Sequence, residues 1–164
     1  MSSPQIYYTQ SVNLKHTGKF YLYLCHFFPY YSEMIDKEAL YSTISENIKI
    51  SVTPLFVAEK SRPEQNFYLF KYRVIVTNKG NEKVQLLSRC WKIRNGNQKE
   101  ELVRGPGVVG KTPVLAPNES FSYESFCPLS TPTGNMRGYF EFMILRNQTK
   151  FQANIPLFFL RLDN

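Results

Sequence analysis

Histidine, aspartate and cysteine are scarce in this sequence of 164 residues. The few present are His16 and His26, Asp36 and Asp163, and Cys25, Cys90 and Cys127. A Ser-His-Asp triad would have to draw its histidine from the first 26 residues. The cysteines are far apart and show no CxxC spacing, which argues against a zinc site and a disulfide framework and indicates a reducing compartment. The sequence therefore predicts no catalytic residue, no metal site and no cofactor.

Long apolar runs are also missing. No stretch of 18 apolar residues occurs, so no membrane-spanning helix is expected. Hydrophobic residues nevertheless make up 43% of the chain, which argues against disorder for most of it. The formal net charge is +7; residues 47–164 carry +8, with 17 Lys and Arg against 9 acids, and residues 1–46 carry −1. This basic excess favours polyanionic partners such as RNA, DNA, phosphorylated ligands or an anionic membrane surface.

Residues 1–46 form a leading segment whose composition differs from the rest of the chain. They hold ten of the 25 aromatic residues, and residues 1–32 contain no acid. This start weakly resembles an organellar transit peptide, so we expect a mitochondrial location, with a cytoplasmic location as the alternative. After Pro29, the spacing of apolar residues predicts a helix over residues 33–45, with Ser32 as its N-cap.

From residue 47 onward the hydrophobic period changes to two, which is typical of strands. Ile48, Ile50 and Val52 alternate with polar residues, and residues 70–77 show the same alternation. Turn signals such as Asn78-Lys79-Gly80-Asn81 separate about seven short strands, with no helical stretch between them. The pattern predicts an all-β fold for residues 47–164: an antiparallel β-sandwich of immunoglobulin or fibronectin type III style.

A glycine-rich loop, Gly105-Pro106-Gly107-Val108-Val109-Gly110, fits the G-x-G-x-x-G pattern. The dinucleotide interpretation requires a helix after the loop, and Pro113 and Pro117 argue against one. A weaker hypothesis is an anion site, because glycines let backbone N–H groups converge and Arg104 and Lys111 flank the loop. The alternative is a loop whose glycines allow positive φ and close packing.

Several motifs within residues 47–162 resemble the ApaG domain in their order and spacing. These are residues 51–57 (SVTPLFV), 84–91 (VQLLSRCW), 103–110 (VRGPGVVG), 115–123 (LAPNESFSY) and 127–138 (CPLSTPTGNMRG). The resemblance implies a fibronectin type III-like sandwich. Cys90 departs from the family pattern, which commonly has His before Trp91, and bacterial members tend to be acidic. Residues 1–46 lie outside the resemblance.

The resemblance implies little about function. ApaG domains occur as small bacterial proteins linked to divalent cation tolerance, in certain eukaryotic F-box proteins as the part that binds substrate or partner, and in a mitochondrial and nuclear polymerase-delta-interacting protein. No catalytic mechanism is established for the family. Its glycine loop has been suggested as a nucleotide or pyrophosphate site, which corresponds here to Gly105, Gly107 and Gly110.

Three functional hypotheses follow. The first is a non-enzymatic module that binds a protein partner within a larger assembly, with a phosphate- or pyrophosphate-like ligand at the glycine loop. The second is an RNA-associated subunit of a ribonucleoprotein such as a mitochondrial ribosome. The third is an enzyme acting on nucleotides or pyrophosphate. The candidate contacts to a partner or to RNA are Lys71, Arg73, Lys92, Arg94 and Arg137.

Overall fold

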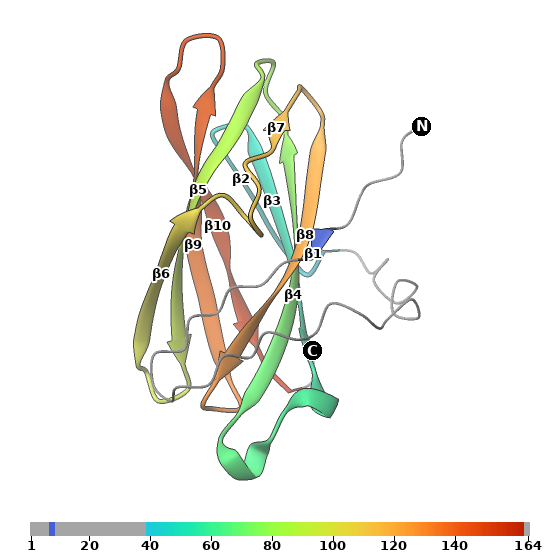
Figure 1. Ribbon diagram of the computed structural model, residues 1–164, viewed down its shortest axis with the longest axis vertical. Coiled ribbons are helices and arrows are strands. Elements are labelled where there is room, and N and C mark those ends of the chain that lie inside the picture. Colours follow the sequence, from blue (N-terminus) through green and yellow to red (C-terminus); the bar gives the residue numbers. More distant parts are fainter. Residues whose placement is uncertain (1–6, 9–38, 163–164) are drawn as a thin grey trace.

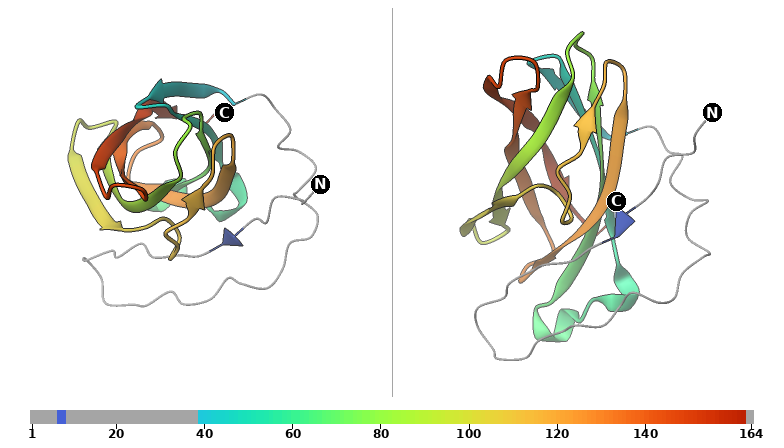
Figure 2. Two further views of the ribbon diagram at one scale, coloured as in Figure 1. Left: turned by 90° about the horizontal axis from the view of Figure 1, so that it is seen from above. Right: turned by 45° about the horizontal axis from the view of Figure 1, so that its top comes forward.

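The structure is a computed structural model that describes residues 7–8 and 39–162. These residues form two sheets packed face to face, with only two short 3-10 helices, η2 (Ala58–Lys60) and η3 (Pro63–Gln65) (Figure 1). Seen from above, the two sheets enclose the core between them (Figure 2). The predicted all-β sandwich is confirmed.

The first sheet has the strand order β1-β8-β4-β3-β2, and the second has the order β10-β9-β5-β6, with β7 added to β5. All pairings are antiparallel except the two-residue pairing of β1 with β8. The first sheet contains β1 (Tyr7–Tyr8), β2 (Tyr41–Ser45), β3 (Ile48–Phe56), β4 (Tyr68–Asn78) and β8 (Ser120–Leu129). The second contains β5 (Val84–Asn95), β6 (Glu100–Pro106), β7 (Val114–Leu115), β9 (Gly134–Ile144) and β10 (Lys150–Leu160).

An aromatic cluster at the centre of the core joins the two sheets. Trp91 on β5 is 2% exposed and packs edge-on against Phe140 and Phe158, with ring centroids 6.0 and 5.9 Å away. From the opposite sheet, Tyr72 meets the Trp91 ring at 5.6 Å. Each such pair adds about 0.5–1.5 kcal/mol beyond the area that it buries.

A bulge in β5 sets which side chains of this strand reach the core. The pairing of β5 with β9 shifts between Leu86 and Ser88, so that Leu87 is an extra residue. Leu86 and Trp91 are five positions apart and would face opposite ways in a regular strand. Because the bulge resets the alternation, both point inward, and Lys92 points outward.

The expected helix over residues 33–45 is wrong where the structure tests it. Residues 41–45 form strand β2, which pairs with β3, and residues 33–38 lie outside the described residues. Leu40 and Ile44, two of the apolar residues that suggested a helix, are 58% and 63% exposed. The turn residues Glu46 and Asn47 both have positive φ, which favours a tight β-hairpin. The sandwich therefore begins before the expected boundary at residue 47.

Two tyrosines of the first sheet have their hydroxyl groups buried. Tyr72 is 5% exposed and Tyr123 is 2% exposed. Burial raises the pKa of both phenols, and a hydrogen bond with Ser125 partly offsets this for Tyr72. The Tyr123 hydroxyl has no hydrogen-bond partner among the described residues. A buried polar group left without a partner costs about 1–3 kcal/mol.

The Tyr123→Phe variant should therefore be as stable as the parent protein or more stable by up to about 1 kcal/mol. Tyr72→Phe loses the bond with Ser125 and should cost about 1 kcal/mol. Urea unfolding at neutral pH measures both. The pKa of Tyr123 is higher in the folded than in the unfolded state. The contribution of this tyrosine to the free energy of unfolding is therefore full below about pH 10 and is lost as the pH rises above that value. Tyr123→Phe should reduce this alkaline loss; a Tyr123→Phe variant less stable than Tyr72→Phe would contradict the assignment.

Candidate functional site

Four of the predicted binding residues share the outer face of the second sheet. Lys92 on β5 lies opposite Arg137 on β9, and Arg94 follows two positions further along β5. On the neighbouring strand β6, Arg104 lies opposite Cys90, which places it on the same face. The three arginines are exposed and Lys92 is half-buried. We call these four residues, Lys92, Arg94, Arg104 and Arg137, the basic face.

Carboxylates balance only part of this charge. Glu100 on β6 lies with its oxygens 2.9 Å from Lys92 Nζ and 3.9 Å from Arg137 Nη2. The hydrogen bond from Lys92, supported by the nearby arginines, lowers the pKa of Glu100. Glu141 on β9 accepts a hydrogen bond of 3.3 Å from Ser88. Within the described part of the chain, these two carboxylates thus share the outer face with the four cations of the basic face and with Lys150, which lies opposite Met143.

Lys71 and Arg73, the other two predicted contacts, lie on the outer face of the first sheet, on the far side of the sandwich. Lys71 Nζ lies 2.8 Å from a carboxylate oxygen of Glu124, which is 6% exposed. Arg73 lies opposite Glu124 in the register of β4 and β8. Because a buried carboxylate requires a nearby cation, Lys71 has a structural role. The structure therefore divides the predicted contact set between two opposite faces.

The glycine loop folds back on itself. Val108 and Lys111 exchange two backbone hydrogen bonds of 2.8 and 2.9 Å, and Gly107 donates its N–H to Leu87 at 2.7 Å. Three N–H groups that an anion would need are thus engaged within the protein. The side chain of Val108 is fully buried in the core. Anion binding by Arg104, Gly105, Gly107, Gly110 and Lys111 stays a prediction, and the geometry favours a role of this loop in packing.

Arg89 supports this loop and was not among the predicted residues. Its guanidinium donates hydrogen bonds of 2.9 Å to the carbonyl oxygens of Pro106 and Gly107. It also lies against Gly105, where an added Cβ would come within 3.1 Å of Arg89 Nη1. The bulge at Leu87 places Arg89 on the inward side of β5, and no sequence signal marks that bulge.

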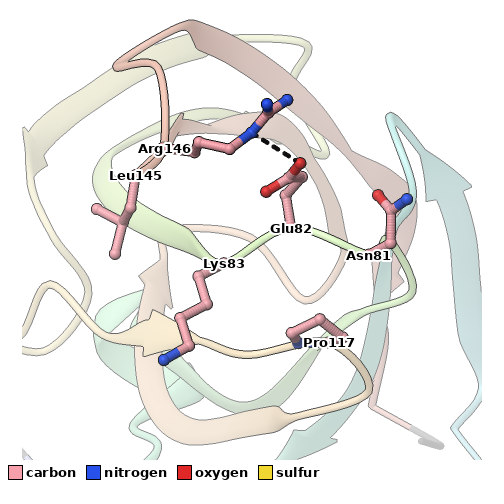
Figure 3. A pocket seen from close by; sticks show the side chains of 6 residues that line it. All are labelled: Asn81, Glu82, Lys83, Pro117, Leu145 and Arg146. Atoms are coloured by element: carbon pink, nitrogen blue, oxygen red, sulfur yellow. Dashed lines mark ion pairs between the residues drawn. The ribbon is translucent and has the colours of Figure 1, made fainter.

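A hollow of about 520 Å³ lies at the end of the sandwich where the β4–β5, β7–β8 and β9–β10 turns meet. Figure 3 shows its lining, with the Arg146 guanidinium directed at the Glu82 carboxylate 2.9 Å away. The Lys83 side chain extends away from that pair (Figure 3). Glu82 and Arg146 neutralise each other, and Lys83 adds one positive charge to the lining.

The described residues contain no group of three or more His, Cys, Asp or Glu side chains arranged to hold a metal ion. Both histidines, His16 and His26, lie outside the described residues. Burial raises the pKa of the Cys127 thiol to about 12, so this thiol stays protonated at neutral pH. Nor does any helix in the described ranges have the length and apolar character needed to cross a membrane.

Comparison with known proteins places this geometry in a family. The model of the ApaG domain matches residues 58–144. A protein named Protein ApaG from Methylobacterium sp. is 49% identical over 121 residues, which cover 74% of this chain and 92% of the relative. The chain belongs to the ApaG domain family.

Two further relatives agree with this assignment. Protein ApaG of Mesorhizobium japonicum is 43% identical over 123 residues, covering 75% of this chain and 94% of the relative. The crystal structure of an ApaA protein from Bordetella pertussis superimposes with a TM-score of 0.68 at 44% identity, covering 70% of this chain and 93% of that one. These ApaG relatives are bacterial, and their names state no activity. The mitochondrial location therefore stays a prediction without support from them.

The loop of this ApaG domain gives a direct test of its packing role. Gly107 has a φ of +54°, and an added Cβ would come within 2.1 Å of the Lys111 carbonyl oxygen. Gly107→Ala should therefore destabilise the domain by more than about 2 kcal/mol in urea unfolding. The matched control is Gly80→Ala, whose Cβ would come no closer than 3.3 Å to side-chain atoms and should cost less than about 1 kcal/mol. Equal effects of the two changes would rule out the packing role.

Proposed function

We propose that this ApaG domain is a non-enzymatic binding module that docks an acidic surface of a protein partner, within a larger assembly, on its basic face. The observation that carries the proposal is the convergence of Lys92, Arg94, Arg104 and Arg137 on one side of the second sheet. Complementary charge on such a face raises the rate at which the partner associates and disfavours partners of the wrong charge.

The composition of the face supports a protein partner over a nucleic acid. Leu102, 54% exposed, lies opposite Lys92 among the cations, and Tyr139 lies opposite Cys90. Arginine and tyrosine are enriched in protein interfaces. Glu100 and Glu141 on the same face would repel a phosphate backbone, whereas a protein surface can present a cation to each.

Side chains suited to acid–base or nucleophilic catalysis are scarce in the part of the chain that the structure describes. It contains no histidine, and the Cys127 thiol is held protonated by its burial. General acid–base catalysis needs a group that titrates near the working pH. A binding role therefore accounts for the site better than hydrolysis of a nucleotide or pyrophosphate.

Reversing charge on the basic face should abolish partner binding. We expect the double variant Arg104→Glu and Arg137→Glu to recover at least about tenfold less partner than the parent chain when tagged protein is purified from its native cell. Both side chains are exposed, so the fold should be retained, which circular dichroism checks. The captured proteins are quantified by mass spectrometry.

The matched control is Lys79→Glu with Lys83→Glu. This pair makes the same change of charge at exposed positions in the β4–β5 turn, away from the basic face. It should recover the partner as the parent does. Treatment with nuclease should leave the complex intact. Loss of the complex with nuclease would instead support the ribonucleoprotein alternative, and equal losses in both double variants would show that only net charge matters.

A further inference from the structure

A second hollow, of about 350 Å³, lies at the opposite end of the sandwich from that in Figure 3. It lies where the β5–β6 turn, the β8–β9 turn and the end of β10 meet (Figure 1). Its lining residues are Arg94, Asn95, Gly96, Gln98, Thr133, Gly134, Asn135, Phe159 and Arg161. None of them is acidic, and two are arginines.

The two arginines reach this hollow from different strands. Arg94, Asn135 and Phe159 are register partners across β5, β9 and β10, so they form one row on the outer face of the sheet. Arg161 follows β10, and its guanidinium carbon lies 4.8 Å from the centre of the Phe159 ring. Stacking on this ring holds the Arg161 guanidinium at the hollow without neutralising its charge.

Among the described residues, the carboxylate that lies opposite Arg94 is already engaged by a lysine. Glu100, which lies opposite Arg94 on β6, places its carboxylate 2.9 Å from Lys92 Nζ. Arg94 itself donates a hydrogen bond to the side-chain oxygen of Gln98, a neutral group. Both guanidinium groups that line the hollow therefore keep positive charge for a ligand.

Hydrogen bonds between the two turns fix the walls. The Gly96 N–H donates to Thr131 Oγ1 at 2.9 Å, and that hydroxyl donates to the Thr133 carbonyl at 2.8 Å. An added Cβ on Gly96 would come within 3.0 Å of Thr133 Oγ1, so the turns are in close contact. A preorganised wall lowers the entropy lost when a ligand binds.

We propose that this hollow binds a phosphomonoester dianion. Two guanidinium forks match the oxygens of a phosphate group, and the amides of Asn135 and Gln98 supply neutral donors. The exposed part of the Phe159 ring can pack against the organic portion of the ester. The phosphate group belongs either to a phosphorylated side chain or to a free small ester, and the recognising chemistry is the same for both.

This site goes beyond the proposed docking function and is tested separately from it. It shares only Arg94 with the basic face, and neither Arg104 nor Arg137 lines the hollow. Its test uses purified protein and defined probes. Failure to recover a protein partner would therefore leave the proposal of a phosphate site unaffected.

The experiment titrates the purified full chain with glycerol 3-phosphate and with an acidic peptide carrying one phosphoserine, and follows amide signals by NMR. Saturable shifts are expected at Gly96, Gln98 and Asn135. Arg161→Gln and Arg94→Gln should each weaken binding at least about tenfold, because each removes a charge-assisted contact. Arg146→Gln, at the opposite end, should leave binding unchanged. Binding should also weaken at pH 5, where the phosphate carries one charge fewer.

The two probes assign the source of the phosphate. Tighter binding of the phosphopeptide than of its unphosphorylated form and of glycerol 3-phosphate identifies a phosphorylated side chain. Equal binding of both phosphate probes identifies a free ester. The proposal is overturned if neither probe gives saturable shifts at about 10 mM, which corresponds to a binding free energy weaker than about 3 kcal/mol. It is also overturned if Arg146→Gln weakens binding as much as Arg161→Gln does.

Discussion

The burial of Trp91 between the two sheets is the constraint on which the arrangement of the site depends. Its ring meets Tyr72 from the first sheet and Phe140 and Phe158 from the second. Side chains alternate along a strand, so an inward Trp91 obliges its neighbour Lys92 to face outward. A slip of one residue would exchange core and surface along the strand. The aromatic cluster thus determines which face of β5 carries the cations.

The sequence predicted the fold because its signals are local. Alternating apolar residues and turn dipeptides define most strands, and the ApaG motifs agree with them. Whether the cations share one face was not predictable, because it depends on long-range strand pairing: β4 joins the first sheet, whereas β5, β6 and β9 join the second. Over residues 41–45 the expected helix is wrong for a related reason: the exposed Ile44 has a helical spacing by chance, and pairing with β3 decides its conformation.

The glycine loop shows why a motif without its context is a weak guide to a site. Its G-x-G-x-x-G pattern suggests a cradle of N–H groups, yet the N–H groups of Gly107, Val108 and Lys111 bond to carbonyl oxygens of the protein. The carbonyl groups of Pro106 and Gly107 are held in turn by Arg89. The glycines are explained by close backbone approach, as the 2.1 Å clash of a Cβ at Gly107 shows.

The distribution of acids gives the two outer faces different electrostatic character. On the first sheet, Lys71 is committed to the buried Glu124. On the second, Glu100 is shared between Lys92 and Arg137, so that one carboxylate holds two cations together rather than cancelling either completely. An ion pair at a half-exposed site is weak, and the distance between Arg137 Nη2 and the Glu100 carboxylate is as long as 3.9 Å. A partner's carboxylate can therefore compete with Glu100 for Arg137. The same residue that gathers the cations thus leaves them available for binding.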